Sequence, residues 1–269
     1  MPGRPLVTLL TDYGPGTEHV GALHAVIAAR APGVERIDLA HDVPPGDVRW
    51  GAILLARLAP LAPPGVHLAV VDPGVGSERR GLAAALRDGR HLVGPDNGLL
   101  GPAAAALGAE AAVELTGPEH RLEPVSATFH GRDVFAPAAA HLAAGGPLDD
   151  LGPAVPPDSI RHPPMPEPRA GEAGIEAMAV GADRFGNVAL LAGAGELTAA
   201  RMEPEDRVWV LVAGRRSRAV VGRTFADVPR GGLLVYVDSH GMLSLAVGGG
   251  NALERLGVEP GEVVGIVAA

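Results

Sequence analysis

The chain of 269 residues contains no cysteine and no lysine. The absence of cysteine excludes a thiol nucleophile, a thiolate metal site, an iron–sulfur cluster and any disulfide. Because all 22 basic residues are arginines, a Schiff-base lysine and the GxxxxGK[ST] phosphate-binding loop are excluded as well.

Positive charge and long hydrophobic runs are also scarce. The formal net charge of −9 argues against a nucleic-acid partner, which requires a basic face. The richest apolar stretch, Ala52–Leu61, contains Arg57 and is shorter than the roughly 18 residues of a membrane span. The N-terminal apolar segment meets Asp12 too early for a signal peptide. We therefore predict a soluble cytoplasmic protein with neither a membrane nor a nucleic-acid partner.

Hydrophobic residues make up 47% of the chain, which is enough for a substantial core. Residues 1–145 alternate strand-like and helix-like patterns, which predicts βαβ units and an N-terminal α/β domain with a mostly parallel sheet. The main expected elements are strands Pro5–Thr11, Val34–Ala40 and Val66–Val71 and helices Glu18–Arg30, Val48–Leu58 and Asp133–Ala143.

The pattern changes in residues 146–171, which are rich in proline and are predicted to form a linker. Residues 172–269 then contain seven strand-like runs with turn signals and no long helix between them. This pattern predicts a smaller C-terminal antiparallel β domain that resembles a barrel. The runs are Ala177–Gly181, Asn187–Leu191, Arg207–Val212, Arg218–Val221, Leu233–Val237, Leu243–Val247 and Val263–Val267.

Three acidic turns follow predicted strands of the first domain. Asp12 follows VTLLT, Asp72 follows VHLAVV and Asp96 follows HLVGP, each beside glycine or proline. Ligands of open α/β sheets bind beyond the carboxyl ends of the strands, although aspartate also caps ordinary turns. Three such turns in one sheet favour a binding site.

Other polar residues have less specific patterns. His130 lies in the compact polar turn FHGRD, and Arg79 and Arg80 follow Asp72 closely. The ten histidines are scattered without metal-ligand spacing. A divalent metal held by the three acidic turns and His130 therefore stays a minor alternative.

Several motifs occur together in one order: TDYG, VDPGVGSERR, GPDNGLL, FHGRDVFAPAAAHLA, DRFGN, TFADVP, SHGMLSLA and GNALERLG. In this combination the chain resembles the S-adenosylmethionine hydrolases (adenosyl-hydroxide transferases), which are relatives of the fluorinase and chlorinase. The resemblance implies an α/β domain followed by a barrel-like domain. It also implies a homotrimer, with the substrate between the N-terminal domain of one subunit and the C-terminal domain of its neighbour, and no metal or other cofactor.

The resemblance places the family's catalytic Asp-Arg-His set on Asp72, Arg79 and His130. The halogenases carry tyrosine in place of Asp72 and His130, and they have an inserted loop after the VDPGVG-like motif. Only 14 residues separate Arg79 from Gly94, which is too few for that loop. These differences imply that water, rather than halide, is the nucleophile.

The resemblance also assigns substrate contacts to seven residues. They are Asp12 for the ribose hydroxyls, Asp183 and Ser239 for the methionine amino group, Asn187 and the backbone near Ala252 for adenine, and Phe185 and Phe225 as aromatic walls. His240 stands where the fluorinase has arginine, so the resemblance does not assign the methionine carboxylate contact.

The implied reaction is hydrolysis of S-adenosyl-L-methionine to adenosine and L-methionine by in-line attack of water on the ribose 5′ carbon. Either Asp72 or His130 could accept the proton. A neighbouring guanidinium weakens a carboxylate as a base, which favours His130 and predicts a rate loss on acidification through about pH 6–7. The alternatives are a halide-dependent adenosyl transferase and a non-catalytic adenosine-binding or S-adenosylmethionine-binding module.

Overall fold

The computed structural model describes residues 5–269. The chain divides into two compact units between Pro164 and Met165, a boundary that lies inside the predicted linker. Each unit has its own hydrophobic core. Within residues 5–269, no helix combines the length and the hydropathy that crossing a bilayer requires.

The first unit is built on one seven-stranded sheet of order β2-β1-β3-β5-β4-β6-β7. Its strands are β1 (Leu6–Thr11), β2 (Glu35–Ala40), β3 (Val66–Val70), β4 (Gly81–Leu86), β5 (His91–Pro95), β6 (Ala109–Glu114) and β7 (Ala154–Val155). Strands β2, β1, β3 and β5 pair in parallel. The side chains of β1 and β3 are buried along their whole length, as expected for parallel strands covered on both faces.

The other half of this sheet is antiparallel. Strands β4 and β5 are joined by the short turn of residues 87–90, and a connection of that length can only reverse the chain. The predicted α/β class is confirmed, and the sheet is mixed, since three of its six strand pairings are parallel and three are antiparallel.

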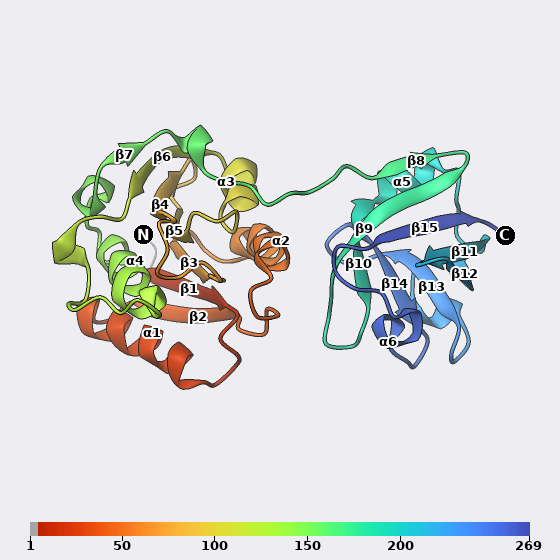
Figure 1. Cartoon of the computed structure of the whole chain (residues 1–269), viewed down its shortest axis with the longest axis horizontal. Helices are drawn as coiled ribbons and strands as arrows, with labels where there is room; N and C mark the ends of the chain where they lie inside the picture. The colour runs from red at the N-terminus through yellow and green to blue at the C-terminus, as the bar shows by residue number, and fades with distance from the viewer. Residues whose placement is uncertain (1–4) are drawn as a thin grey trace. The chain divides into compact units, whose positions relative to one another are not determined.

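Helices cover both faces of the sheet (Figure 1). The helices are α1 (Glu18–Arg30), α2 (Val48–Leu58), α3 (Gly101–Leu107) and α4 (Ala136–Ala143). Helix α1 packs against α4, and α2 packs against α3. Leu23 and Ile27 of α1 join Leu9 and Leu68 of the sheet in one core. A π-helical turn over Gly131–Phe135 leads into α4, so the helix expected from Asp133 starts in a wider turn.

The second unit is a closed seven-stranded barrel, because β9 pairs with both β15 and β10. Its elements are β8 (Arg169–Gly171), β9 (Gly174–Ala182), β10 (Val188–Gly193), α5 (Ala194–Ala199), β11 (Arg207–Val212), β12 (Arg215–Val221), β13 (Leu233–Val237), β14 (Met242–Val247), α6 (Ala252–Leu256) and β15 (Val263–Ala268). Alternate side chains such as Val210, Leu245 and Ile266 fill its interior. The predicted barrel is confirmed, and β12–β13 is a parallel pair within it.

Asp96 anchors the proline-rich chain to the first unit. Its carboxylate is fully buried and accepts hydrogen bonds from the backbone N–H of Arg161 at 2.9 Å and from Nε and Nη2 of Arg80 at 2.9 and 2.6 Å. Arg80 also donates to the carbonyl of Ser159 at 3.0 Å. Asp96, a candidate ligand-binding acid by sequence, therefore has a structural role.

We expect Asp96→Ala to lower the free energy of unfolding by about 3 kcal/mol, because the change leaves the partly buried guanidinium of Arg80 and the backbone N–H of Arg161 without their acceptor. Urea denaturation followed by circular dichroism measures this loss. Glu110→Ala is the matched control, since Glu110 pairs with Arg87 at 3.7 Å with both side chains exposed, and we expect it to cost less than about 1 kcal/mol. Equal losses in the two variants would contradict the anchoring role.

Candidate active site

The turn after β3 brings the backbone close to a neighbouring segment. Gly76 has a φ of +79°, and a Cβ atom there would lie 2.4 Å from the carbonyl oxygen of Ala127. Only glycine fits this position without displacing the backbone. The VDPGVG turn is thereby held against the segment that leads to His130.

Arg79 forms a bidentate salt bridge with Asp72. Its Nε lies 3.0 Å from both carboxylate oxygens, and its Nη2 donates to Oδ2 at 2.5 Å. The two side chains are only 8% and 5% exposed. The guanidinium also lies 5.1 Å from the ring centre of Phe135, so the pair is fixed by charge and by packing.

The same guanidinium reaches His130. Nη2 of Arg79 lies 2.8 Å from Nδ1 of His130. Arginine can only donate, so Nδ1 is the acceptor and the proton of the neutral imidazole resides on Nε2. Burial, followed by the charge of Arg79, lowers the pKa of His130 below its ordinary value of 6.5. The structure therefore brings the three predicted catalytic residues together with a defined tautomer.

Asp72 shares a pocket of about 440 Å³ with Asp12. The pocket lies where β1 and β3, neighbouring parallel strands, end. Oδ2 of Asp12 accepts a hydrogen bond from the backbone N–H of Gly46 at 2.8 Å. Burial raises the pKa of Asp12, and the Gly46 N–H partly offsets this effect. Two carboxylates thus line one cavity at the edge predicted from the sequence.

Tyr13 is a pocket residue that the sequence analysis did not select. Its ring contacts Phe129 edge to face, with 5.7 Å between the ring centres. A Cβ atom on Gly131 would lie 2.3 Å from the Tyr13 hydroxyl, so the glycine after His130 makes room for the phenol. Burial raises the Tyr13 pKa. The TDYG motif contained the residue, but nothing in it distinguished a pocket wall from a core aromatic.

The predicted contacts of the second unit begin with one tight turn between β9 and β10. Oδ1 of Asp183 accepts hydrogen bonds from the backbone N–H groups of Phe185 and Asn187, both at 2.9 Å. Its Oδ2 accepts from Nδ2 of Asn187 at 2.8 Å. Phe185 is 63% exposed. Asp183 and Asn187 are thus hydrogen-bonded to each other, and the turn that they stabilise leaves the ring of Phe185 exposed.

Of the other predicted substrate contacts in the second unit, Ala252 is hydrogen-bonded directly to this turn, whereas Phe225 and Ser239 lie in other loops. The backbone N–H of Ala252 donates to the carbonyl of Gly186 at 3.1 Å, so Ala252 adjoins the turn. Phe225 packs on Tyr236 with 5.4 Å between ring centres. Burial and then the charges of Asp183 and Asp238 raise the Tyr236 pKa to about 12. The sequence analysis did not select Tyr236, which is the ring that Phe225 contacts. Ser239 lies exposed in the β13–β14 turn.

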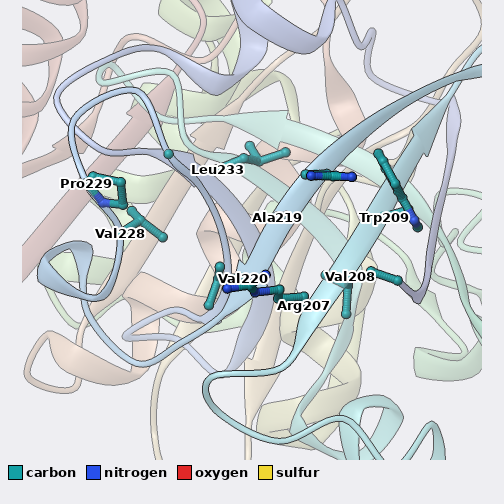
Figure 2. A pocket seen from close by; sticks show the side chains of 11 residues that line it. Arg207, Val208, Trp209, Ala219, Val220, Val228, Pro229 and Leu233 are labelled. Atoms are coloured by element: carbon teal, nitrogen blue, oxygen red, sulfur yellow. The ribbon is translucent and has the colours of Figure 1, made fainter.

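The barrel also carries a separate pocket of about 570 Å³. Figure 2 shows Trp209, Val208, Ala219, Val228 and Leu233 around it. Arg216 and Arg218 lie 4.9 and 5.2 Å from the Trp209 ring centre. None of the predicted site residues is among the described residues that line this pocket.

Within residues 5–269, two groups of side chains have a composition and spacing that could hold a metal ion. They are His24, Asp38 and His41, and His120, His141 and Asp150. Neither group includes a predicted catalytic residue. The carboxylate of Asp96, one member of the alternative metal site, is occupied by Arg80 and the Arg161 backbone.

Comparison with known proteins gives consistent matches over both units. Residues 7–152 match the sequence model of the SAM hydroxide adenosyltransferase N-terminal domain, and residues 178–265 match that of the C-terminal domain. The (R)-S-adenosyl-L-methionine hydrolase of Salinispora tropica is 50% identical over 269 residues, with 100% of both chains covered. That of Thermus thermophilus is 43% identical, over 96% of this chain and 97% of its own.

More distant relatives and solved structures agree with these matches. The fluorinase of an Actinoplanes species is 26% identical over 91% of each chain. The crystal structure of an uncharacterized conserved protein from Thermotoga maritima has a TM-score of 0.89 at 35% identity, covering 97% of this chain and 99% of that one. The family predicted from the ordered motifs is thus confirmed, and the chain belongs to the SAM hydroxide adenosyltransferase family.

Proposed function

We propose that the protein hydrolyses S-adenosyl-L-methionine to adenosine and L-methionine. The observation that carries this proposal is the buried contact of Asp72, Arg79 and His130 beside the Asp12 pocket. The names of the full-length relatives from Salinispora and Thermus support the same reaction.

The reaction is an in-line displacement at the ribose 5′ carbon. The oxygen of water forms the new bond to carbon, and the sulfur departs with the electron pair of the broken bond as neutral methionine. The leaving group needs no proton, so the protein has to position water and accept one proton. Positioning alone can contribute roughly 7–11 kcal/mol.

The tautomer of His130 favours Asp72 as the proton acceptor. The Nδ1 lone pair of His130 is occupied by Arg79, and its Nε2 already carries a proton, so His130 can donate to water but cannot accept from it. A weak base suffices, because the attacking oxygen becomes strongly acidic as its bond to carbon forms. Asp72 therefore takes the proton, and Arg79 and His130 orient the carboxylate and the water. This assignment revises the preference for His130 drawn from the sequence.

We assign the substrate contacts to the residues that the family resemblance selects. Asp12, oriented by the Gly46 N–H, binds the two ribose hydroxyls through its carboxylate. The exposed Phe185 and Phe225 stack on the adenosyl group, and Asp183 and Ser239 contact the methionine amino group. The chain acts as a cytoplasmic homotrimer without a metal cofactor in the reaction, and a neighbouring subunit supplies the contacts of the barrel.

We expect chelator-treated protein to convert S-adenosyl-L-methionine to equal amounts of adenosine and methionine, at a rate that does not depend on chloride or fluoride. Chromatography of the products measures both. A halogenated nucleoside that forms only with halide would replace the hydrolase by a halogenase. Tight adenosine binding without turnover would indicate a binding module.

We expect Asp72→Asn to reduce kcat at least about 100-fold, because it removes the proton acceptor. His130→Ala should cost about 10–150-fold, the value of one hydrogen bond to a charged group. His130→Asn should recover most of that loss, since the amide oxygen can accept from Arg79. Circular dichroism checks folding, and Glu110→Ala serves as the unaffected control. If His130→Asn were as inactive as His130→Ala, His130 would be the base after all.

The pH profile tests the same assignment. Because the pKa of His130 is lowered, its imidazole stays neutral to below pH 6.5. Protonation would place an N–H group against Arg79 and break the contact. We expect kcat/KM to fall on acidification with a midpoint below pH 6.5, and His130→Asn to lose this acidic limb. A midpoint above 6.5, or an unchanged limb in His130→Asn, would contradict the assignment.

A further inference from the structure

Three side chains from separate elements converge beside β2, the edge strand of the first sheet. His24 lies on α1, Asp38 lies on the edge strand β2, and His41 follows the end of β2. Nε2 of His24 is 2.9 Å and Nε2 of His41 is 3.1 Å from the same oxygen, Oδ1 of Asp38. One carboxylate oxygen is thus faced by two imidazole nitrogens.

Among these three residues, His41 gives the evidence for a bound ligand. Its side chain is only 6% exposed, and within residues 5–269 its Nε2 has no hydrogen-bond partner, although Oδ1 of Asp38 is near. The nitrogen and the oxygen are close but not aligned for a hydrogen bond. Such an arrangement is expected where both atoms point toward a third atom. A buried imidazole nitrogen without a partner is costly unless something binds it.

We propose that His24, Asp38 and His41 form a binding site for a divalent transition-metal ion, with zinc as the preferred ion. Two imidazoles and one carboxylate suit zinc, with water as a fourth ligand. The candidate ligand atoms lie within 4.8 Å of one another, and a tetrahedral ion with bonds of about 2.0–2.1 Å would need separations of about 3.3 Å. The His24 and Asp38 side chains are partly exposed, which leaves them room to rotate toward this geometry.

The environment of His41 supports this site. Its Nδ1 lies 2.8 Å from Oγ1 of the buried Thr11. With a metal on Nε2, Nδ1 carries the proton and donates to this hydroxyl, which fixes the ring in the way typical of metal-binding histidines. The nearby positive group, Arg36, is directed to the main-chain carbonyl of His24 and does not occupy the three ligand atoms.

The site is connected to the active-site turn but is separate from it. Oγ1 of Thr11 also accepts a hydrogen bond from the backbone N–H of Tyr13 at 3.2 Å. The backbone carbonyl of His41 accepts a hydrogen bond from the backbone N–H of Gly14 at 2.8 Å. A bound metal would therefore rigidify the turn that carries Asp12. This role is structural, and it does not depend on the proposed hydrolysis.

The test is metal titration of the untagged full chain after chelator treatment, with zinc followed by calorimetry and cobalt followed by its visible absorption. We expect His24→Ala and Asp38→Asn each to remove one equivalent of bound zinc, or to weaken it at least 10-fold, and to abolish the tetrahedral cobalt band. The zinc-dependent rise in Tm should disappear with it. These two variants change partly exposed side chains, so they avoid the folding risk of His41→Ala.

His120→Ala is the matched control, because His120 belongs to the other cluster. In that cluster, Nε2 of His141 donates to the Pro147 carbonyl at 3.0 Å, which is not a candidate metal ligand. In the proposed site, Nε2 of His24 instead faces Asp38, which is itself a candidate ligand. We expect His120→Ala to bind zinc as the wild type does. The proposal is overturned if the wild type binds no zinc, if His24→Ala and Asp38→Asn bind it unchanged, or if only His120→Ala loses it.

Discussion

The buried guanidinium of Arg79 is the group on which the active site depends. A charge with 8% exposure must be paired, and residues of two different segments contact it. Asp72, just after β3, receives the bidentate contact, His130 ahead of the π-helical turn accepts an N–H of Nη2, and Phe135 packs on the face of the guanidinium. The positions of these segments are consequently coupled, and disturbance of either one leaves a buried charge without a full set of partners.

Two adjacent arginines bind the acidic residues that follow two neighbouring strands, one in the proposed catalytic group and one in a structural anchor. Arg79 turns to Asp72 after β3, and Arg80 turns to Asp96 after β5. The sequence pattern treats Asp72 and Asp96 alike, since each follows an apolar strand beside glycine or proline. Their roles differ because Arg161, far along the chain, brings its backbone N–H to Asp96 and excludes it from the pocket. No local pattern could distinguish the two.

Much of the fold was predictable, and the exceptions have physical causes. Period-two and period-3.6 patterns identified the seven barrel strands and helices α1 and α2, because each buries one regular face. The tautomer of His130 and the Asp183–Asn187 contact depend on side-chain geometry that spacing does not encode. The same holds for His24, Asp38 and His41, which come from a helix, a strand and a turn and converge only through the packing of α1 beside β2.

The charges around the pocket suit a reaction in which a cation disappears. A sulfonium loses its positive charge as the carbon–sulfur bond breaks, so a strongly anionic pocket would stabilise the substrate more than the transition state. Of the two pocket carboxylates, Asp72 is neutralised by Arg79, and burial raises the pKa of Asp12. The pocket therefore has enough negative character to attract the substrate. Because Arg79 neutralises Asp72, the pocket does not stabilise the cationic substrate strongly, and in the proposed mechanism Asp72 still accepts the proton released by water.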